Sequence, residues 1–491
     1  MTIQETSAPA LCHIIGGEPV AAPHASMLDV TDPSTGEAIA RVPMGGAADV
    51  DAAVKAAAKA QKDWARVPLK DRIQVMFRLK TLIEERMDHL ASIVTRENGK
   101  LAGEAKGEIA RAVECIEFAT SLPQVAAGPV LEVSRGVECR MVREPLGVVA
   151  GITPFNFPLM VPLWTLPVAV TCGNAYLLKP SELTPLSAME LATLLEEAGL
   201  PPGVFSVVHG GREAVEAICD HPGIAAIGFV GSTKVARSVY TRGCAAGKRV
   251  KALGGAKNHL VVLPDADAGM TVANVVASAT GCAGQRCMAA SVLLAVKGTE
   301  DIVEAITARF AAMRAGKEIG PVISAAARER IERYIDRCAA DGATVAVDGR
   351  KGVDASAAKG GHWVGPTLFD HARPGHAVSC DEIFGPTLTV IRCESFDEAI
   401  AIENASPFGN AATVYTSSGE AANYFIEHAS AGMVGVNIGV PVPREPFPFG
   451  GWNDSSFGQG DLTGHGSHEF WTKTKKITTK WSDKHRSNWM S

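Results

Sequence analysis

The sequence lacks the short signatures by which many nucleotide-binding enzymes and hydrolases are found. It contains no H-E-x-x-H, no G-x-S-x-G, and no G-x-G-x-x-G after a strand-like run. Residues 243–249 approach a P-loop, but only three residues separate the two glycines and no Ser or Thr follows Lys248. These absences exclude the usual zinc-peptidase, serine-hydrolase and P-loop sites, and they leave a dinucleotide site only in an unusual form.

Basic charge is also scarce, since 47 Lys and Arg residues stand against 53 Asp and Glu residues and leave a net charge of −6. A nucleic-acid-binding protein usually has a basic domain or stripe, so we expect no nucleic-acid partner.

The first 15 residues lack a basic region followed by an apolar core, and we predict no signal peptide. Residues 145–178 carry no charge, yet their five prolines favour a buried strand–turn–helix–strand over a membrane span.

The 11 cysteines include no C-x-x-C pair, and their odd number is untypical of a disulfide framework. Their scatter does not match a zinc site either, so we expect no metal. Unpaired cysteines are typical of a reducing compartment, and we therefore expect a cytoplasmic protein without a membrane partner.

The length of 491 residues indicates two to four domain-sized units. Residues 47–117 are rich in Ala, Lys, Glu and Leu at helical spacing. From residue 147 onward, short apolar runs alternate with helix-like segments, which is the rhythm of a parallel, doubly wound sheet. We predict strands near 147–153, 175–180, 205–210 and 225–231, and helices near 163–172, 185–198, 213–219 and 233–246.

A second α/β series is predicted from residue 259 to about residue 436. Residues 129–142 alternate weakly like a hairpin, and residues 475–481 form a late β-prone run. An isolated two-stranded ribbon is marginally stable, so we expect these segments to pair with each other or with another subunit. The strands of the second series are predicted at 259–265, 290–296, 344–350 and 387–392.

Two strand ends carry residues suited to a dinucleotide. In FVGSTKVA, Gly231 permits a tight turn and Ser232 is a good N-cap, so the following helix would present free N–H groups to a phosphate. In LLKPSE, Lys179 and Glu182 lie where ligands of such sheets bind, and a Glu there accepts hydrogen bonds from a ribose. Taken alone, FVGSTKVA is also compatible with a plain capped helix, and LLKPSE with solvated loop charges.

Two other segments carry possible catalytic groups. GQRCMA places Cys287 beside Arg286, whose guanidinium would favour the nucleophilic thiolate. TPFNFP holds Asn156 in a tight apolar turn, where its amide could donate to an oxyanion. The alternatives are a buried core cysteine and a turn asparagine.

In this order, several segments together resemble the aldehyde dehydrogenase superfamily over nearly the whole chain. The resemblance implies an α/β fold with a Rossmann-like NAD domain, an α/β catalytic domain and a small β-arm for oligomerisation into a dimer or tetramer. The implied boundaries are 1–128 and 144–256 for the NAD domain, 129–143 for a hairpin, 257–445 for the catalytic domain, 446–470 for a return segment and 471–491 for the arm. The matching segments are TPFNFP, LLKPSE, FVGST, GQRC, EIFGP (382–386) and PFGN (407–410).

Within the superfamily the chain looks most like the CoA-acylating methylmalonate-semialdehyde dehydrogenases. That resemblance implies a Cys287 thioester, with Asn156 supporting the oxyanion, and NAD and CoA as cofactor and co-substrate. It also implies NAD contacts from Thr153, Phe155, Lys179, Glu182, Leu183, Ser232, Gly254, Glu382 and Phe384. The segments that carry it are GAKNH (255–259), PFNFPLMVPLW (154–164), ICDHP (218–222), GQRCMA (284–289) and VGVNIGVPVP (434–443).

Two features bear on the substrate and the acyl acceptor. Hydrolytic relatives activate water with a Glu, but the corresponding position here is Ala252 or Leu253, depending on which neighbouring residues anchor the alignment. A thiol such as CoA is then the natural acceptor. The resemblance implies that Arg111 and Arg286 hold a substrate carboxylate, although Arg111 is also compatible with a solvated helix position and Arg286 with a role in Cys287 ionisation alone.

We therefore expect NAD-dependent oxidation of methylmalonate or malonate semialdehyde, with decarboxylation to propionyl-CoA or acetyl-CoA. One alternative is a hydrolytic aldehyde dehydrogenase for another anionic aldehyde, with water activated by a different base. The other is a catalytically silent scaffold, which the paired presence of Cys287 and Asn156 disfavours.

Overall fold

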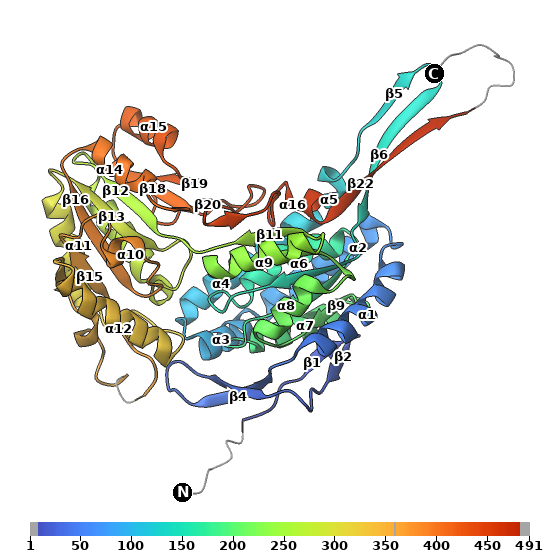
Figure 1. Ribbon diagram of the computed structural model, residues 1–491, viewed down its shortest axis with the longest axis horizontal. Helices are drawn as coiled ribbons and strands as arrows, with labels where there is room; N and C mark the ends of the chain where they lie inside the picture. The colour runs from blue at the N-terminus through green and yellow to red at the C-terminus, as the bar shows by residue number, and fades with distance from the viewer. Residues whose placement is uncertain (1–7, 358–359, 482–491) are drawn as a thin grey trace, which may run out of the picture.

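Two α/β lobes and a projecting β-arm make up the molecule (Figure 1). The computed structural model describes residues 8–357 and 360–481. The ends of the ranges implied for the first domain and for the arm, residues 1–7 and 482–491, lie outside the described residues. In the described part, no helix is long and apolar enough to cross a membrane.

The first lobe is built on an eight-stranded sheet in the order β2-β1-β9-β8-β7-β10-β11-β21. Its five central strands, β7 to β11, run parallel, and the predicted apolar runs of this region are confirmed as strands. The antiparallel edges come from β1 and β2 near the N-terminus and from β21 late in the chain. The strands are β1 (His13–Ile15), β2 (Glu18–Val20), β7 (Val148–Ile152), β8 (Ala175–Lys179), β9 (Phe205–Val207), β10 (Ile224–Val230), β11 (Arg249–Leu253) and β21 (Ser456–Phe457).

Helices cover both faces of this sheet, as a parallel sheet requires. Alternate side chains of β7 divide between two cores: Val149 packs with α2, α4, α6 and α7, whereas Val148 and Ala150 pack with α1, α8 and α9. The helices are α1 (Ala47–Trp64), α2 (Leu69–Glu85), α3 (Met87–Asn98), α4 (Ala102–Thr120), α5 (Leu122–Val125), α6 (Met160–Thr171), α7 (Leu186–Glu197), α8 (Arg212–Asp220) and α9 (Thr233–Ala245).

The second lobe has a seven-stranded sheet in the order β14-β15-β16-β13-β12-β18-β19, parallel except for β14. The predicted second series is confirmed, and β15, β18 and β19 are additional strands. The strands are β12 (Asn258–Val262), β13 (Ala290–Val296), β14 (Thr344–Val347), β15 (Thr367–Asp370), β16 (Thr387–Cys393), β18 (Ala411–Tyr415) and β19 (Met433–Val436). The helices are α10 (Ala268–Thr280), α11 (Glu300–Ala312), α12 (Ala325–Ala340), α13 (Ala377–Cys380), α14 (Phe396–Asn404) and α15 (Gly419–His428).

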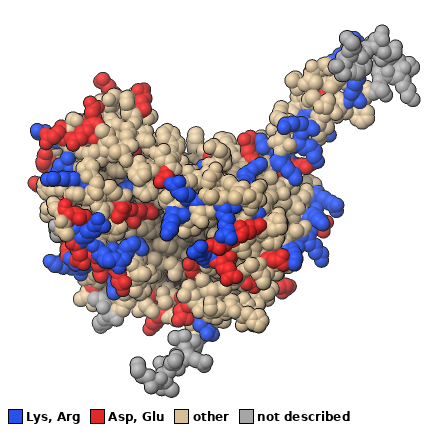
Figure 2. Space-filling model, in the orientation of Figure 1, with Lys and Arg blue, Asp and Glu red and all other residues tan. Residues whose placement is uncertain are grey.

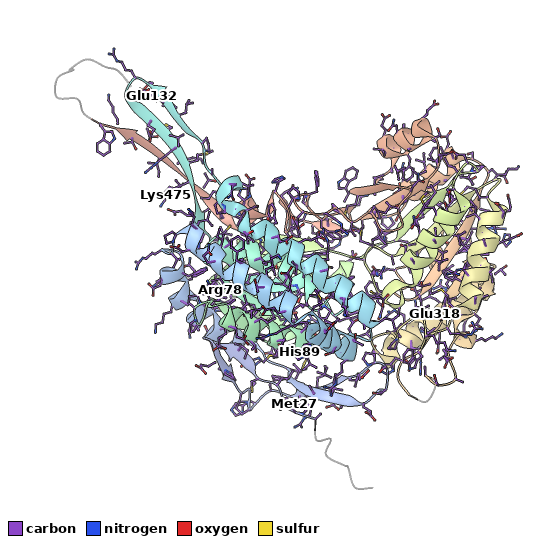
Figure 3. All side chains as sticks on the ribbon, turned by 180° about the vertical axis from the view of Figure 1, so that it is seen from behind. Met27, Arg78, His89, Glu132, Glu318 and Lys475 are labelled. Carbon is purple, nitrogen blue, oxygen red and sulfur yellow. The ribbon has the colours of Figure 1, made fainter. Side chains whose placement is uncertain are left out.

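The arm consists of β5 (Val130–Ser134), β6 (Val137–Pro145) and β22 (Thr472–Lys480). β22 pairs antiparallel with β6 over its whole length, which confirms that the hairpin and the late β-prone run pair with each other. Figure 3 shows Glu132 towards the tip of the arm and Lys475 nearer the lobes. Figure 2 shows both signs of charge interspersed over the face in view, with basic side chains gathered where the arm leaves the first lobe.

Short elements complete the chain. β3 and β4 form a separate antiparallel pair. β17 and β20 pair between the two lobes. The segment after β20 returns to the first lobe, where it forms β21 in the first sheet and then the helix α16. Their bounds are β3 (Met27–Thr31), β4 (Ala38–Pro43), β17 (Phe408–Gly409), β20 (Trp452–Asn453) and α16 (Ser467–Phe470).

Candidate active site

Cys287 lies between the lobes, after a turn that only small residues permit. α10 ends at Thr280, and the next residues form a short turn in which Cys282, Ala283 and Gly284 have left-handed φ angles of 51°, 53° and 67°. A Cβ on Gly284 would lie 1.8 Å from the Gly385 carbonyl oxygen, so the two segments approach as closely as backbone allows. The Gly- and Ala-rich sequence before Cys287 is therefore explained by this turn.

Two asparagines from the second lobe hold the cysteine backbone. The Nδ2 of Asn258, at the start of β12, and the Nδ2 of Asn410, just before β18, donate to the Cys287 carbonyl oxygen at 2.8 and 2.9 Å. These residues belong to the GAKNH and PFGN segments, so two distant motifs converge on one carbonyl group. The sulfur-bearing residue is thus positioned by rigid strands rather than by a mobile loop.

Cys287 lines two large cavities. One, of about 380 Å³, also contains Ser232, Gly254 and Glu382 in its wall; we call it the cofactor-side cavity. The other, of about 450 Å³, contains Arg111 and Arg286; we call it the substrate-side cavity. Phe157 and Trp164 line both cavities and separate them beside the cysteine.

Arg286 acts on Cys287 in the expected direction, because its charge lowers the pKa of the thiol, but burial outweighs this effect. Burial, together with the nearby carboxylate of Glu382, raises the pKa of Cys287 to about 12. The lowering by Arg286 is a smaller contribution than either of these, and its guanidinium also lies 3.4 Å from the carboxylate of Glu104. The thiol therefore stays protonated near neutral pH in this state.

Asn156 is 5% exposed and lies in the turn before α6. Its Nδ2 donates to the Gln285 carbonyl oxygen at 3.0 Å, which places the amide against the chain leading to Cys287. Asn156 also lines the cofactor-side cavity with Cys287, so the predicted pair is brought together.

A buried ion pair that the sequence analysis missed supports this turn. The Lys100 ammonium bridges the Glu108 carboxylate and the Asn156 carbonyl oxygen. The side chains of Lys100 and Glu108 are at most 1% exposed. Glu108 also accepts from the backbone N–H groups of Leu159 and Met160 at 3.0 and 3.1 Å. A signal was present, because Glu104, Glu108 and Arg111 recur at helical spacing on one face of α4.

Two glycines shape the cofactor-side cavity at the end of β11. A Cβ on Gly254 would lie 2.8 Å from the Asp454 carbonyl oxygen, and one on Gly255 would lie 2.3 Å from a Glu382 carboxylate oxygen. Because neither position has room for a side chain, only backbone lies here, beside the N-terminus of α9. Ser232 is the N-cap residue of α9 as predicted, but its hydroxyl makes no capping bond. These features fit a dinucleotide whose phosphates approach backbone N–H groups.

The predicted partners at the end of β8 also lie together. Lys179 is 5% exposed and its Nζ donates to Glu182 at 3.1 Å. The Thr153 backbone N–H donates to the Lys179 carbonyl oxygen at 3.1 Å, which joins the ends of β7 and β8. Leu183 packs beside Phe155 at the edge of the second-lobe core.

Phe155 and Glu382 connect this wall to the second lobe. The rings of Phe155 and Phe384 meet edge to face with centroids 5.8 Å apart. Glu382 accepts from the Ala256 N–H at 3.0 Å, and burial raises the pKa of its carboxyl. All nine residues assigned to the cofactor by resemblance thus lie around the ends of β7, β8, β10 and β11 or face them from the segment before β16.

The substrate-side cavity combines charge with an apolar wall. The Arg111 guanidinium, 16% exposed, donates to the Glu114 carboxylate and to the Pro443 carbonyl oxygen. Arg286 is 22% exposed and pairs with Glu104. The apolar lining comes from Phe157, Met160, Trp164, Met288, Ile438, Val440, Val442 and Phe449.

The positions that could hold a water-activating Glu are apolar in the structure as well. Ala252 and Leu253 are the last residues of β11, pair with β21, and are 0% and 3% exposed. Neither supplies a base. The acids that line the two cavities are Glu382, Glu104 and Glu108.

Comparisons with known proteins identify the family of the chain. The aldehyde dehydrogenase family model matches residues 20–477. A malonate-semialdehyde dehydrogenase of Geobacillus thermodenitrificans is 45% identical over 483 residues, covering 97% of this chain and all of the relative. The structure of a protein described as a methylmalonate-semialdehyde dehydrogenase of Sinorhizobium meliloti, in complex with NAD, superposes with a TM-score of 0.95 at 38% identity, covering 98% of this chain and all of that one. The methylmalonate-semialdehyde dehydrogenase of Oceanimonas doudoroffii gives a TM-score of 0.94 at 40% identity, covering 97% and 99% of the two chains.

Proposed function

The chain belongs to the aldehyde dehydrogenase family, and we propose that it oxidises a short semialdehyde acid through a thioester on Cys287 and transfers the acyl group to CoA. The observation that carries this proposal is the position of Cys287 between a glycine-shaped cavity and an arginine-lined cavity. Malonate and methylmalonate semialdehyde are the substrates we propose, in line with the relatives' names.

Each step assigns a task to residues of this chain. The Cys287 thiol loses its proton to solvent, the thiolate sulfur attacks the aldehyde carbon, and the Asn156 Nδ2 donates to the oxyanion that forms. Arg111 and Arg286 bind the substrate carboxylate at the other end. Bound NAD supplies a hydride acceptor, which the fit of the cofactor-side cavity supports. Lys179 and Glu182 would hold the adenosine ribose, and Glu182 would disfavour a 2′-phosphate, so we propose NAD rather than NADP.

The acyl acceptor follows from the apolar end of β11. Ala252 and Leu253 cannot deprotonate water, so hydrolysis of the thioester should be slow. A thiol ionises far more readily than water and needs less help. With a 3-oxo acid, loss of CO₂ gives propionyl-CoA or acetyl-CoA.

Rapid mixing followed by mass analysis of the product tests this function. We expect a single-turnover burst of NADH without CoA, then slow turnover that CoA accelerates while it appears as acyl-CoA. Equal steady rates of free-acid formation with CoA omitted would support the hydrolytic alternative, and one of the acids lining the cavities would then have to activate water.

The arm supports a further part of the proposal, association of the chain with copies of itself. Val130, Leu131 and Val133 on β5 are 62%, 65% and 52% exposed. Such apolar groups are usually covered. We propose a homodimer or homotetramer, which light scattering of the intact chain would reveal. All 11 cysteines are free, and this supports a reducing, cytoplasmic location.

A further inference from the structure

A third arginine, Arg444, lines the substrate-side cavity together with Arg111 and Arg286. Its side chain is 75% exposed, whereas those of the other two are 16% and 22% exposed. Arg444 therefore lies at the open end of the cavity, and Cys287 lies at the closed end. It directly follows Pro443, whose carbonyl oxygen accepts from Arg111.

One carboxylate lies between two of these arginines. Glu114, three residues after Arg111 on α4, accepts from Arg111 through one oxygen and from Arg444 through the other, the latter at 2.6 Å. The nearby Glu445 turns towards Cys115 instead, whose sulfur lies 3.4 Å from its carboxylate. Glu114 thus already occupies the kind of position on Arg111 that a substrate carboxylate would take.

We propose that Glu114 and Arg444 determine how strongly this cavity selects aldehydes that carry a carboxylate. Glu114 is a built-in counter-ion that competes with the substrate carboxylate for Arg111. Arg444 offers the Glu114 carboxylate an alternative partner and adds positive charge at the entrance. The inference rests on the proposed use of Arg111 as a carboxylate-binding residue.

A purely helix-stabilising role makes different predictions. An i,i+3 ion pair on a helix surface stabilises the helix by a few tenths of a kcal/mol and has no preference among ligands. A counter-ion paired with cavity-lining arginines instead acts on anionic and neutral ligands differently, because only the anion competes with it for those arginines. The comparison of a charged and an uncharged reagent of the same size therefore separates the two roles.

Alkylation of Cys287 provides such a comparison and requires neither turnover nor CoA. Iodoacetate carries a carboxylate, and iodoacetamide is its neutral counterpart. Saturating NAD fills the cofactor-side cavity, so both reagents must approach through the substrate-side cavity. The ratio of their two rates at Cys287, read by peptide mass analysis, measures the preference for a carboxylate.

We expect Glu114→Gln to raise this ratio roughly two- to fivefold and Arg444→Gln to lower it by a similar factor, the size typical of partly exposed ion pairs. Glu117→Gln is the matched control: it removes the same charge from α4, but Glu117 is 53% exposed and faces Lys80 at 3.5 Å. Its ratio should equal that of the unmodified chain.

Arg111→Leu distinguishes the inference from the function on which it rests. If Arg111→Leu leaves the ratio unchanged, Arg111 does not bind carboxylates and the proposed substrate recognition is wrong. If Arg111→Leu lowers the ratio but Glu114→Gln leaves it unchanged or lowers it, only the counter-ion role is overturned. An unchanged ratio in Arg444→Gln overturns the part assigned to Arg444.

Discussion

The two cavities that meet at Cys287 are made by different means. The cofactor-side cavity has one wall made of backbone at the ends of parallel strands, where Gly254 and Gly255 leave room and any side chain would collide. The substrate-side cavity is formed by side chains, with charged groups from one face of α4 set against an apolar wall. A wall made of backbone changes only with the fold, whereas a wall made of side chains changes with single substitutions. Cofactor use should therefore be robust in this protein, and substrate choice should be easy to alter.

The largest effect is expected at the residue that both cavities share. Cys287→Ser removes the nucleophile, and we expect NADH formation to fall by roughly 10⁴-fold or more, as in other enzymes deprived of theirs. NAD binding, measured by fluorescence titration, should be nearly unchanged because the glycine-shaped wall is intact. Full activity in this variant would remove the central claim.

Asn156→Ala tests the wall next to the cofactor. Loss of one oxyanion donor typically costs about 10²–10³ in kcat. We expect a loss of that size with little change in NAD affinity, measured under conditions in which a deuterated aldehyde shows that hydride transfer limits the rate. An unchanged kcat under those conditions would contradict the assigned role.

Arg111→Leu addresses the substrate-side cavity alone. A hydrogen bond to a charged group contributes about 1.5–3 kcal/mol, so kcat/KM for a semialdehyde acid should fall roughly 10- to 100-fold. An uncharged aldehyde of similar length should be affected far less. Equal losses on both aldehydes would make Arg111 a structural residue.

The smallest effect is expected from Glu382, whose carboxylate raises the pKa of Cys287. Removing that negative charge stabilises the thiolate relative to the thiol, so Glu382→Gln should lower the pKa of Cys287 and increase alkylation by iodoacetamide a few-fold at pH 8.

In the unmodified chain the alkylation rate of Cys287 should still be rising with pH above pH 9, because burial holds the pKa of the thiol near 12. A plateau below pH 9 would show that the thiol is not buried as the structure has it.

Short-range patterns predicted most of the fold. The apolar run that ends at Lys179 is β8, and the run that precedes Ser232 is β10. The helices between these strands begin and end close to the predicted residues. Shorter or edge strands were missed, for example β1 and β19, because three or four residues do not establish a period of two. The pairing of β22 with β6 was left open between two partners, since nothing local distinguishes the same chain from another copy.

The sequence by itself predicted most strands and helices of the two lobes from local patterns, and the family resemblance of its short motifs supplied the candidate nucleophile and cofactor residues. Only the tertiary structure decided the charge state of those groups. Arg286 is adjacent to Cys287 in sequence, yet its guanidinium pairs with Glu104 and burial governs the thiol. Lys100, Glu108 and Glu114 each also have a partner that is far away in the sequence: the Asn156 carbonyl oxygen, the Leu159 N–H group and the Arg444 guanidinium. Electrostatic energy depends on distance in space, so these contacts could not be predicted from the sequence.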